Sequence, residues 1–231
     1  MEYLSNIELY FCSSISKDEK TIQLVDEEHH HATKVMRKKI GDSIFATDGK
    51  GKIIEGVINS IDKKCIYVKV VKSFSYKNRL NNFTFCIPNL RNPDRFKFAL
   101  EKCVELGITN FVLFNSERSI SKNFNIDRIN KILLSAMKQS LQSYLPKVEI
   151  YDSVLKFGEL KDLKILFEQN SKNKLGNQKF DVTNNYYFIF GPEGGFSEKE
   201  ILVIQPTVIL NLAENRLRSE TAIIKAASLI S

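Results

Sequence analysis

The stretch Gly191-Pro192-Glu193-Gly194-Gly195 decides the fold class of the larger part of this chain. It follows the apolar run from Tyr186 to Phe190, and an aromatic, β-branched run that stops at glycines is typical of a buried strand ending in a tight loop. Glycine has no Cβ, so backbone N–H groups in such a loop can approach a ligand closely. The loop therefore predicts a ligand site, although short loops between a strand and a helix also occur without one.

A helix is predicted to begin directly after this loop. Ser197 and Glu200 have the Ser-x-x-Glu spacing of a capping box, and Phe196 can pack on Ile201 as a hydrophobic staple. Strand, glycine loop and helix start thus follow one another without a gap.

From residue 82 onward, strand patterns alternate with helical patterns, which favours an α/β fold with a mainly parallel sheet. Gly107 is expected to close one helix, and Pro146 to follow another. The predicted strands are Phe83 to Ile87, Phe111 to Phe114, Leu163 to Phe167, Tyr186 to Phe190 and Thr207 to Leu210; the predicted helices contain Phe96 to Val104, Ile129 to Leu141 and Ala222 to Ile230.

Ligands of parallel α/β sheets bind where the strands end. Three loops follow predicted strands at that edge: Glu168 to Asn170, Gly191 to Gly195, and Asn211 to Ser219. We expect them to form one pocket. The polar stretch 170–185 has no periodicity, and we expect a mobile surface loop there.

The first 74 residues predict a small antiparallel β-domain. A short polar helix from Asp26 to Lys38 precedes strands with period-two alternation. The tip Gly49-Lys50-Gly51-Lys52 is a flexible basic turn, either a phosphate contact or only a solvated hairpin. We expect a linker from Ser73 to Asn82. The predicted strands are Ser43 to Thr47, Ile53 to Ile61 and Cys65 to Val71.

The charge balance favours a polyanionic partner. Among 231 residues, 34 Lys and Arg oppose 27 Asp and Glu, a net charge of +7. Nucleic acid is the leading candidate and a generic basic surface the alternative. No stretch has the length and apolarity of a membrane helix, and Met1-Glu2-Tyr3 does not begin a secretory signal, so we expect a cytoplasmic protein.

The residue types that bind metals do not converge in this sequence. His29, His30 and His31 are adjacent, so on a helix their side chains point about 100° apart. The cysteines form no Cys-x-x-Cys pair, and we expect buried, reduced thiols and no metal. The four cysteines are Cys12, Cys65, Cys86 and Cys103.

Several enzyme classes lack their motifs here. There is no Gly-x-Ser-x-Gly elbow of a hydrolase, no Walker phosphate loop, and no Gly-x-Gly-x-x-Gly after the first strand of an α/β unit. Arg216 and Arg218 precede the last predicted helix; a guanidinium can grip phosphate or stack on a base, although exposed arginines are also common. Ser219 is expected to cap that helix, with Glu220 favourably placed in its first turn.

Two motifs, taken together, are specific for one protein family. Residues 191–200 read Gly-Pro-Glu-Gly-Gly-Phe-Ser-x-x-Glu and residues 217–222 read Leu-Arg-Ser-Glu-Thr-Ala, and both resemble the 16S rRNA uracil N3-methyltransferases of the SPOUT superfamily. The resemblance covers nearly the whole chain. Its other motifs are Glu101 to Gly107, Ser116 to Ser119, Gln139-Ser140 with Pro146, and His31 with Val35 to Arg37 and Gly41-Asp42.

The resemblance implies an N-terminal PUA-like β-barrel for RNA docking, residues 1–74, and a C-terminal SPOUT α/β domain, residues 75–231, whose end threads a trefoil knot. It implies a homodimer that binds S-adenosylmethionine in the knot. Arg216 stands in for an arginine that the family usually has at position 215. The implied cofactor-binding residues are Phe167, Glu168, Gly191, Pro192, Glu193, Gly194, Gly195, Leu210, Leu212, Arg216 and Leu217.

The activity implied by the resemblance is methylation of N3 of a uridine, uracil 1498 of 16S rRNA, in the assembled small ribosomal subunit. The implied catalytic residues are Arg218, Glu220 and Thr221, and the expected RNA-binding residues are Lys34, Arg37, Lys38, Lys39 and Arg118.

Two rival functions stay open. A related knotted enzyme could methylate a ribose 2′-hydroxyl, which the glycine loop alone allows, but residues 217–222 differ from the Ser-Leu-Asn-Val type of run in those enzymes. A non-catalytic RNA-binding module could keep the fold and lack activity, and Asn215, which departs from the family pattern, keeps this reading open.

Overall fold

The computed structural model describes residues 7–12, 14–119 and 123–231, so Met1-Glu2-Tyr3 lies outside the described residues. The chain forms two compact units: residues 1–78 with 137–145, and residues 79–136 with 146–231. The predicted boundary between residues 74 and 75 stays a prediction.

The second unit is built on a six-stranded sheet in which every pair is parallel. The strand order is β12-β10-β11-β7-β8-β9, so the last strand lies beside β10 at one edge. The strands are β7 (Phe83–Pro88), β8 (Asn110–Phe114), β9 (Lys147–Tyr151), β10 (Leu163–Phe167), β11 (Tyr186–Phe190) and β12 (Val208–Leu210).

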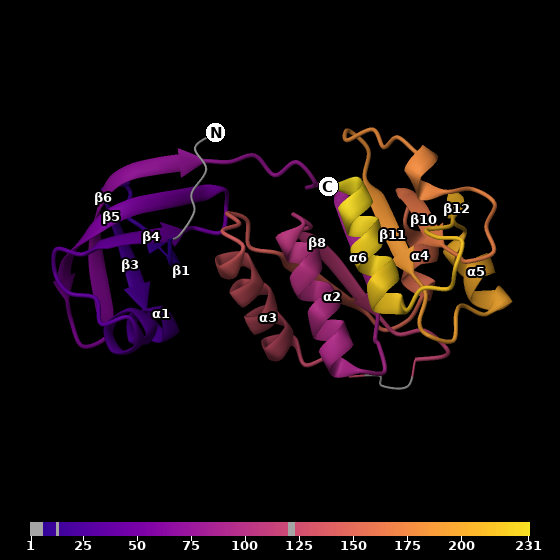
Figure 1. Ribbon diagram of the computed structural model, residues 1–231, viewed down its shortest axis with the longest axis horizontal. Coiled ribbons are helices and arrows are strands. Elements are labelled where there is room, and N and C mark those ends of the chain that lie inside the picture. Colours follow the sequence, from indigo (N-terminus) through magenta and orange to yellow (C-terminus); the bar gives the residue numbers. More distant parts are fainter. Residues whose placement is uncertain (1–6, 13, 120–122) are drawn as a thin grey trace. The chain divides into compact units, whose positions relative to one another are not determined.

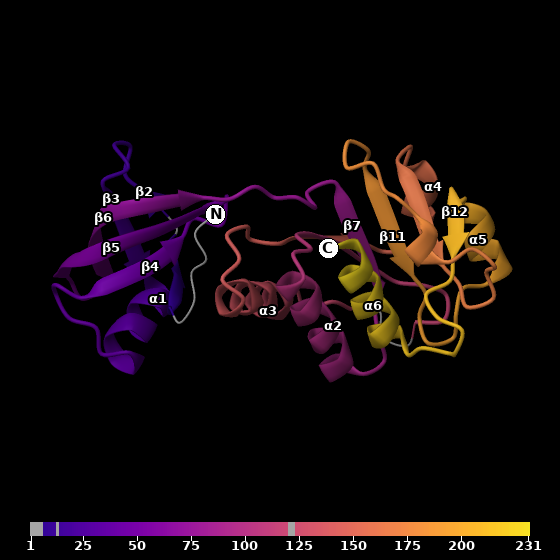
Figure 2. The same cartoon turned by 45° about the horizontal axis from the view of Figure 1, so that its top comes forward.

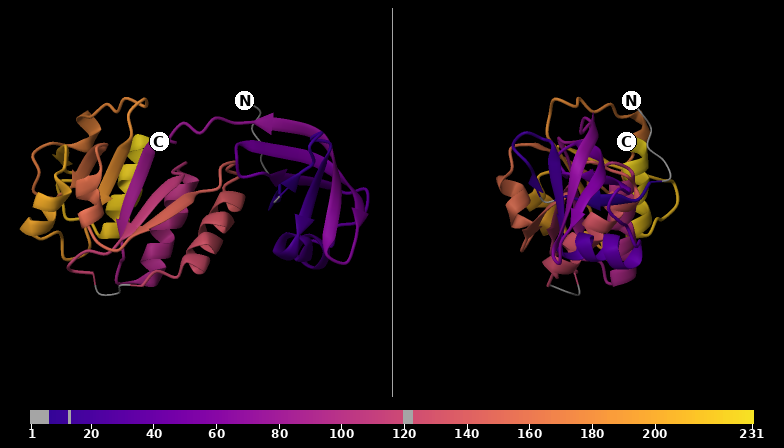
Figure 3. Two further views of the ribbon diagram at one scale, coloured as in Figure 1. Left: turned by 180° about the vertical axis from the view of Figure 1, so that it is seen from behind. Right: turned by 90° about the vertical axis from the view of Figure 1, so that its left-hand side faces the viewer.

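Helices cover the sheet of the second unit. α2 packs on α6, and α4 packs on α5. Figure 1 and Figure 2 show α6 in front of the strands beside α2, and Figure 3 (left) shows the yellow α6 behind them after a half turn. The helices are α2 (Pro93–Glu105), α3 (Ile126–Gln139), α4 (Leu155–Glu159), α5 (Glu198–Ile204) and α6 (Ser219–Ile230), with a 3₁₀ turn η2 (Leu175–Asn177).

Alternate residues of the central strands explain why the sheet is buried. Cys86 of β7 and Ile189 of β11 belong to the apolar core that includes Phe157 of α4 and Ile204 of α5. Neighbouring residues on the strands point to the other face. These runs read as continuous apolar stretches because a parallel sheet is covered on both faces.

The first unit is a six-stranded sheet around its own core. The order is β1-β4-β5-β6-β3-β2, and β1 and β4 are the parallel pair. Its elements are β1 (Leu9–Phe11), β2 (Ser14–Ile15), β3 (Thr21–Val25), α1 (Asp26–His30), a π-helix η1 (His31–Val35), β4 (Ser43–Thr47), β5 (Lys52–Ile61) and β6 (Cys65–Ser75).

Sequence patterns missed β1, β2, β3 and β9. Three of these, β1, β2 and β9, lie at a sheet edge, and β9 alternates exposed and half-buried residues there, whereas β3 lies between β6 and β2. β6 continues to Ser75, so the expected linker starting at Ser73 is wrong at its beginning. The expected helix from Asp26 to Lys38 is α1 followed by a π-helix that ends at Val35.

Two loop predictions need correction. The stretch 170–185 is not only a surface loop: Leu175 is buried, and its N–H donates to the Asn211 carbonyl at 3.0 Å. The basic hairpin tip is docked on residues 143–145, because Gly51 N–H donates to the Ser143 carbonyl and Leu145 N–H to the Gly49 carbonyl, both at 2.9 Å. These contacts, together with a 2.6 Å ion pair between Lys138 and Glu28, place residues 137–145 in the first unit.

Three of the four cysteines are buried as expected, whereas Cys65 is half-buried; all four are free thiols. Burial is the main cause that raises the pKa of the Cys12 thiol to about 12. Within the described ranges, every helix is too short or too polar to span a membrane.

Candidate functional site

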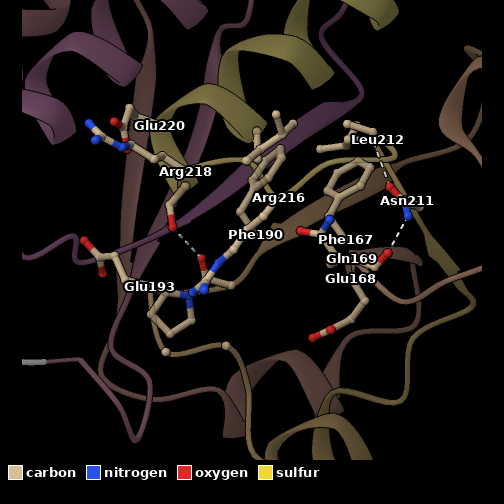
Figure 4. Close-up of a pocket in the computed structure, with 18 of the residues that line it drawn as sticks. Phe167, Glu168, Gln169, Phe190, Glu193, Asn211, Leu212, Arg216, Arg218 and Glu220 are labelled. Carbon is tan, nitrogen blue, oxygen red and sulfur yellow. Dashed lines mark hydrogen bonds between the residues drawn. The ribbon is translucent and has the colours of Figure 1, made fainter.

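The three predicted loops line one cavity of about 610 Å³ at the carboxyl ends of the strands. Figure 4 shows Glu168 and Leu212 on one side of it and Arg218 and Glu220 on the other. The expectation that these loops meet is thereby confirmed. The lining residues are Phe167, Glu168, Gln169, Phe190, Gly191 to Gly195, Asn211 to Ala213, Asn215 to Glu220, Ala222 and Arg95.

Three other parts of the second unit hold the glycine loop. The N–H of Arg91 donates to Glu193 Oε1 at 3.0 Å, and the guanidinium of Arg118 donates to the Gly194 carbonyl. The Ser219 hydroxyl donates to the Gly191 carbonyl at 3.4 Å. The loop is therefore fixed at both of its ends.

The predicted capping box is confirmed, and its glutamate also binds a second loop. Ser197 Oγ accepts from Glu200 N–H, and Glu200 Oε2 accepts from Ser197 N–H at 2.9 Å. Buried Glu200 also accepts from Glu117 N–H at 2.8 Å. One carboxylate thus joins the start of α5 to the loop after β8.

The segment after β12 is bonded to the loop after β10. Asn211 N–H donates to the Asn173 carbonyl, and its side-chain amide donates to the Gln169 carbonyl. The N–H of Glu168 donates to the Leu210 carbonyl at 3.0 Å. The chain then continues to α6, which packs on α2 and β11. The resemblance implies a knot that binds the cofactor at these two loops and at the glycine loop.

The start of α6 differs from the prediction. Arg218 is the N-cap residue without a side-chain cap bond, and Ser219 is the first helical residue. The expectation that Ser219 caps this helix is wrong, because its hydroxyl donates to Gly191 instead. This contact joins α6 to the glycine loop.

Charged groups gather at the α6 end of the cavity. Arg95 Nε lies 3.5 Å from Glu220 Oε1, and only 13% of the Glu220 side chain is exposed. Arg216 and Arg218 are exposed, and neither has a side-chain partner among the residues that the structure describes. On the opposite side, burial raises the pKa of the Glu168 carboxyl.

Nearly all predicted cofactor and catalytic residues line the cavity, with two exceptions. Leu210 is fully buried and does not line it, and Thr221 is exposed outside it. Eight lining residues were not among the predicted cofactor and catalytic residues. Seven of them flank predicted positions in the sequence, and the eighth, Arg95, follows a helix start marked by Asn92-Pro93. The eight residues are Arg95, Gln169, Phe190, Asn211, Ala213, Asn215, Ser219 and Ala222.

Four of the residues expected to bind RNA lie close together in the sequence of the first unit. Lys34, Arg37 and Lys39 are exposed, whereas the Lys38 ammonium donates to the Ser43 carbonyl at 2.9 Å. Arg37 follows the π-helix in the left-handed backbone region (φ 54°), a conformation that costs energy in a non-glycine residue. π-Helices occur frequently at functional sites.

Arg118, the fifth expected RNA-binding residue, lies after β8 in the second unit and contacts the glycine loop. Replacing it with Gln should weaken cofactor binding about 5- to 10-fold, because one charge-assisted bond to Gly194 is lost. Calorimetric titration with S-adenosylmethionine checks this, with Arg128→Gln on the exposed start of α3 as control. Unchanged cofactor affinity with weaker RNA binding would instead assign Arg118 to RNA alone.

Comparison with known proteins agrees with this geometry. Residues 78–231 match the family model of the RNA methyltransferase domain, and residues 24–71 match the RNA methyltransferase PUA domain. Ribosomal RNA small subunit methyltransferase E 1 of Borreliella burgdorferi is 30% identical over 91% of each chain. Methyltransferase E of Bacillus subtilis is 26% identical over 91% of this chain and 90% of its own.

A solved structure supports the same fold. The ribosomal RNA small subunit methyltransferase E of Neisseria gonorrhoeae, bound to S-adenosyl methionine, superposes with a TM-score of 0.84 at 25% identity over 96% of each chain. The expected fold class, a SPOUT α/β domain with a PUA-like N-terminal domain, is confirmed. The chain therefore belongs to the RNA methyltransferase family, among the small-subunit ribosomal RNA methyltransferases E.

Proposed function

We propose that this protein transfers a methyl group from S-adenosylmethionine to N3 of a uridine in the 16S rRNA of the small ribosomal subunit. One observation carries the proposal: the glycine loop, the loop after β10 and the segment after β12 enclose one cavity, with an exposed arginine and a carboxylate at its α6 end. The Neisseria gonorrhoeae relative was solved with this cofactor.

The cavity fits such a cofactor. Its walls combine apolar side chains, such as Leu212 and Leu217, with the backbone of a glycine loop. A Cβ on Gly194 would come within 3.2 Å of Arg118 Cδ, so the loop is closely packed behind the cavity. Bound there, S-adenosylmethionine would supply an electrophilic methyl group.

Methylation of N3 requires that the uracil N–H proton leaves while a new N–C bond forms. Glu220 is the proposed acceptor of that proton, and Arg218 stabilises the negative charge on the base. The glycine loop, Leu212 and Leu217 would hold S-adenosylmethionine, which would supply the methyl group to N3 and keep the S–C electron pair as a thioether. Thr221 is the residue after Glu220 in α6, and it does not line the cavity. A catalytic role for Thr221 requires the bound RNA to extend beyond the cavity to this side chain.

N3 is on the pairing edge of uracil, so the base must be unpaired or flipped at a cost of a few kcal/mol. Phosphate contacts by Lys34, Arg37 and Lys39 offset this cost. RNA affinity should fall steeply with salt, and replacing these three by Ala should make the log–log slope shallower by roughly two to three. Filter binding of the RNA between about 50 and 200 mM salt measures this slope. A slope that is unchanged in the triple variant would exclude phosphate contacts by these three residues.

We also propose a homodimer that acts in the cytoplasm, where small subunits mature. Phe98 on α2 and Leu229 on α6 are each about half exposed, and these two helices pack on each other. Exposed large apolar side chains on neighbouring helices favour a protein contact. Light scattering of the purified protein gives the oligomeric state.

The experiment that tests the function is methyl transfer to unmodified small subunits, followed by mass spectrometry of the digested nucleosides. 3-Methyluridine supports the proposal. A 2′-O-methylated nucleoside would assign the protein to the ribose methyltransferases, and cofactor binding without product would favour an RNA-binding module.

A further inference from the structure

A third arginine, Arg95, lines the cavity from a different element than Arg216 and Arg218. It is the third residue of α2, and its N–H donates to the capping Asn92 Oδ1 at 3.1 Å. The next residue, Phe96, is buried. The backbone of Arg95 is therefore fixed by a cap on one side and by the core on the other.

This position is unfavourable for a cation. The N-terminus of a helix carries partial positive charge, so arginine in the first turn of α2 costs stability rather than adding it. A residue that breaks a local rule at a cavity is a candidate for a functional role. The compensating contact is the one with Glu220, whose Oε1 lies 3.5 Å from Arg95 Nε.

The two partners differ in exposure. The Glu220 side chain is 13% exposed and that of Arg95 41% exposed. Glu220 lies in the first turn of α6 and Arg95 in the first turn of α2, and these helices pack on each other. The ion pair with Arg95 thus orients the Glu220 carboxylate, which is already restricted by its burial.

We propose that Arg95 is a positioning residue that aims the Glu220 carboxylate at the N3 proton of the target base. This rests on the proposed function. Arg218 has no side-chain partner among the described residues and stays free for the base, whereas Arg95 acts through Glu220. The proton passes from N3 to a carboxylate oxygen of Glu220, and Arg95 gives up no proton.

A double-mutant cycle tests this coupling. Methyl incorporation into small subunits is measured for wild type, Arg95→Gln, Glu220→Gln and the double variant, whichever nucleoside receives the methyl group. Arg95→Gln should lower kcat about 10- to 100-fold with little change in KM, and should add almost nothing in the Glu220→Gln background. Arg95→Lys should recover part of the loss, because an ammonium keeps the charge without the planar fork.

One control variant and three possible outcomes decide between the alternatives. Lys97→Gln removes a cation and an ion pair two residues further along α2, outside the cavity, and should leave kcat unchanged. Independent, multiplicative losses in the cycle would overturn the proposal. So would a raised KM with a shallower salt slope, which indicates phosphate contact, or a weaker calorimetric cofactor Kd that matches the loss in kcat.

The proposed function and this inference fail differently. Non-additive losses with a 2′-O-methyl product would overturn N3 chemistry and keep the coupling between Arg95 and Glu220. A 3-methyluridine product with multiplicative losses would keep the function and overturn the coupling. Absence of any methyl transfer by wild type would overturn both.

Discussion

Replacing Arg218 with Ala should lower turnover about 100- to 1,000-fold while cofactor affinity changes little. Arg218 is exposed at the start of α6, lines the cavity, and has no side-chain partner within the described part of the chain. A cation kept free at this place can stabilise charge that develops on the base in the transition state, and removal of one such group typically costs two to three orders of magnitude.

Steady-state kinetics on small subunits and calorimetry with S-adenosylmethionine separate the two quantities. Lys225→Ala, an exposed cation further along α6, is the matched control for lost positive charge. Turnover that survives in the Arg218 variant would exclude this residue from the chemistry. An equal loss in cofactor affinity would assign it to the cofactor instead.

Replacing Gly56 with Ala should destabilise the protein by about 2 to 3 kcal/mol. Gly56 lies in β5 at a register shift against β6. A Cβ there would lie 2.5 Å from Val68 Cγ1 and 2.6 Å from the Lys69 carbonyl oxygen. Because Val68 is fully buried and the oxygen is backbone, neither can move cheaply, and overpacking of this kind costs about 1 to 3 kcal/mol or more.

Urea denaturation followed by circular dichroism measures this change in the full-length protein. Gly176→Ala is the control, because its Cβ would meet open space. A Gly56 variant as stable as wild type would show that the strand pair relaxes around the methyl group. Cofactor affinity should survive in the folded Gly56 variant, because the cavity lies in the other unit.

Local patterns in the sequence predicted the elements that build the site. The apolar run before Gly191 is a buried strand, and Ser197 and Glu200 form a capping box, because both features depend on neighbours within a few residues. The three loops meet because parallel strands end at one edge of a sheet. The position of the cavity therefore follows from the sequence pattern.

Tertiary contacts decided the remaining features of the site. Serine is a common helix cap, yet the Ser219 hydroxyl donates instead to the Gly191 carbonyl, which is 28 residues away in sequence. Arg118 was expected on RNA, and only the packing of two loops brings its guanidinium to Gly194. At Arg95 the sequence shows only the helix start at Asn92-Pro93, and nothing local indicates its partner Glu220, which is far along the chain.

The sequence by itself determined the alternation of strands and helices, the glycine loop and the family resemblance, because these depend on residue type and short spacing. Only the tertiary structure decided that residues 137–145 join the first unit, that the loop at 170–185 is bonded to Asn211, and that Arg95 faces Glu220. Contacts between residues far apart in sequence have no periodicity, and they form only when burial and hydrogen-bond satisfaction are met by the whole fold at once.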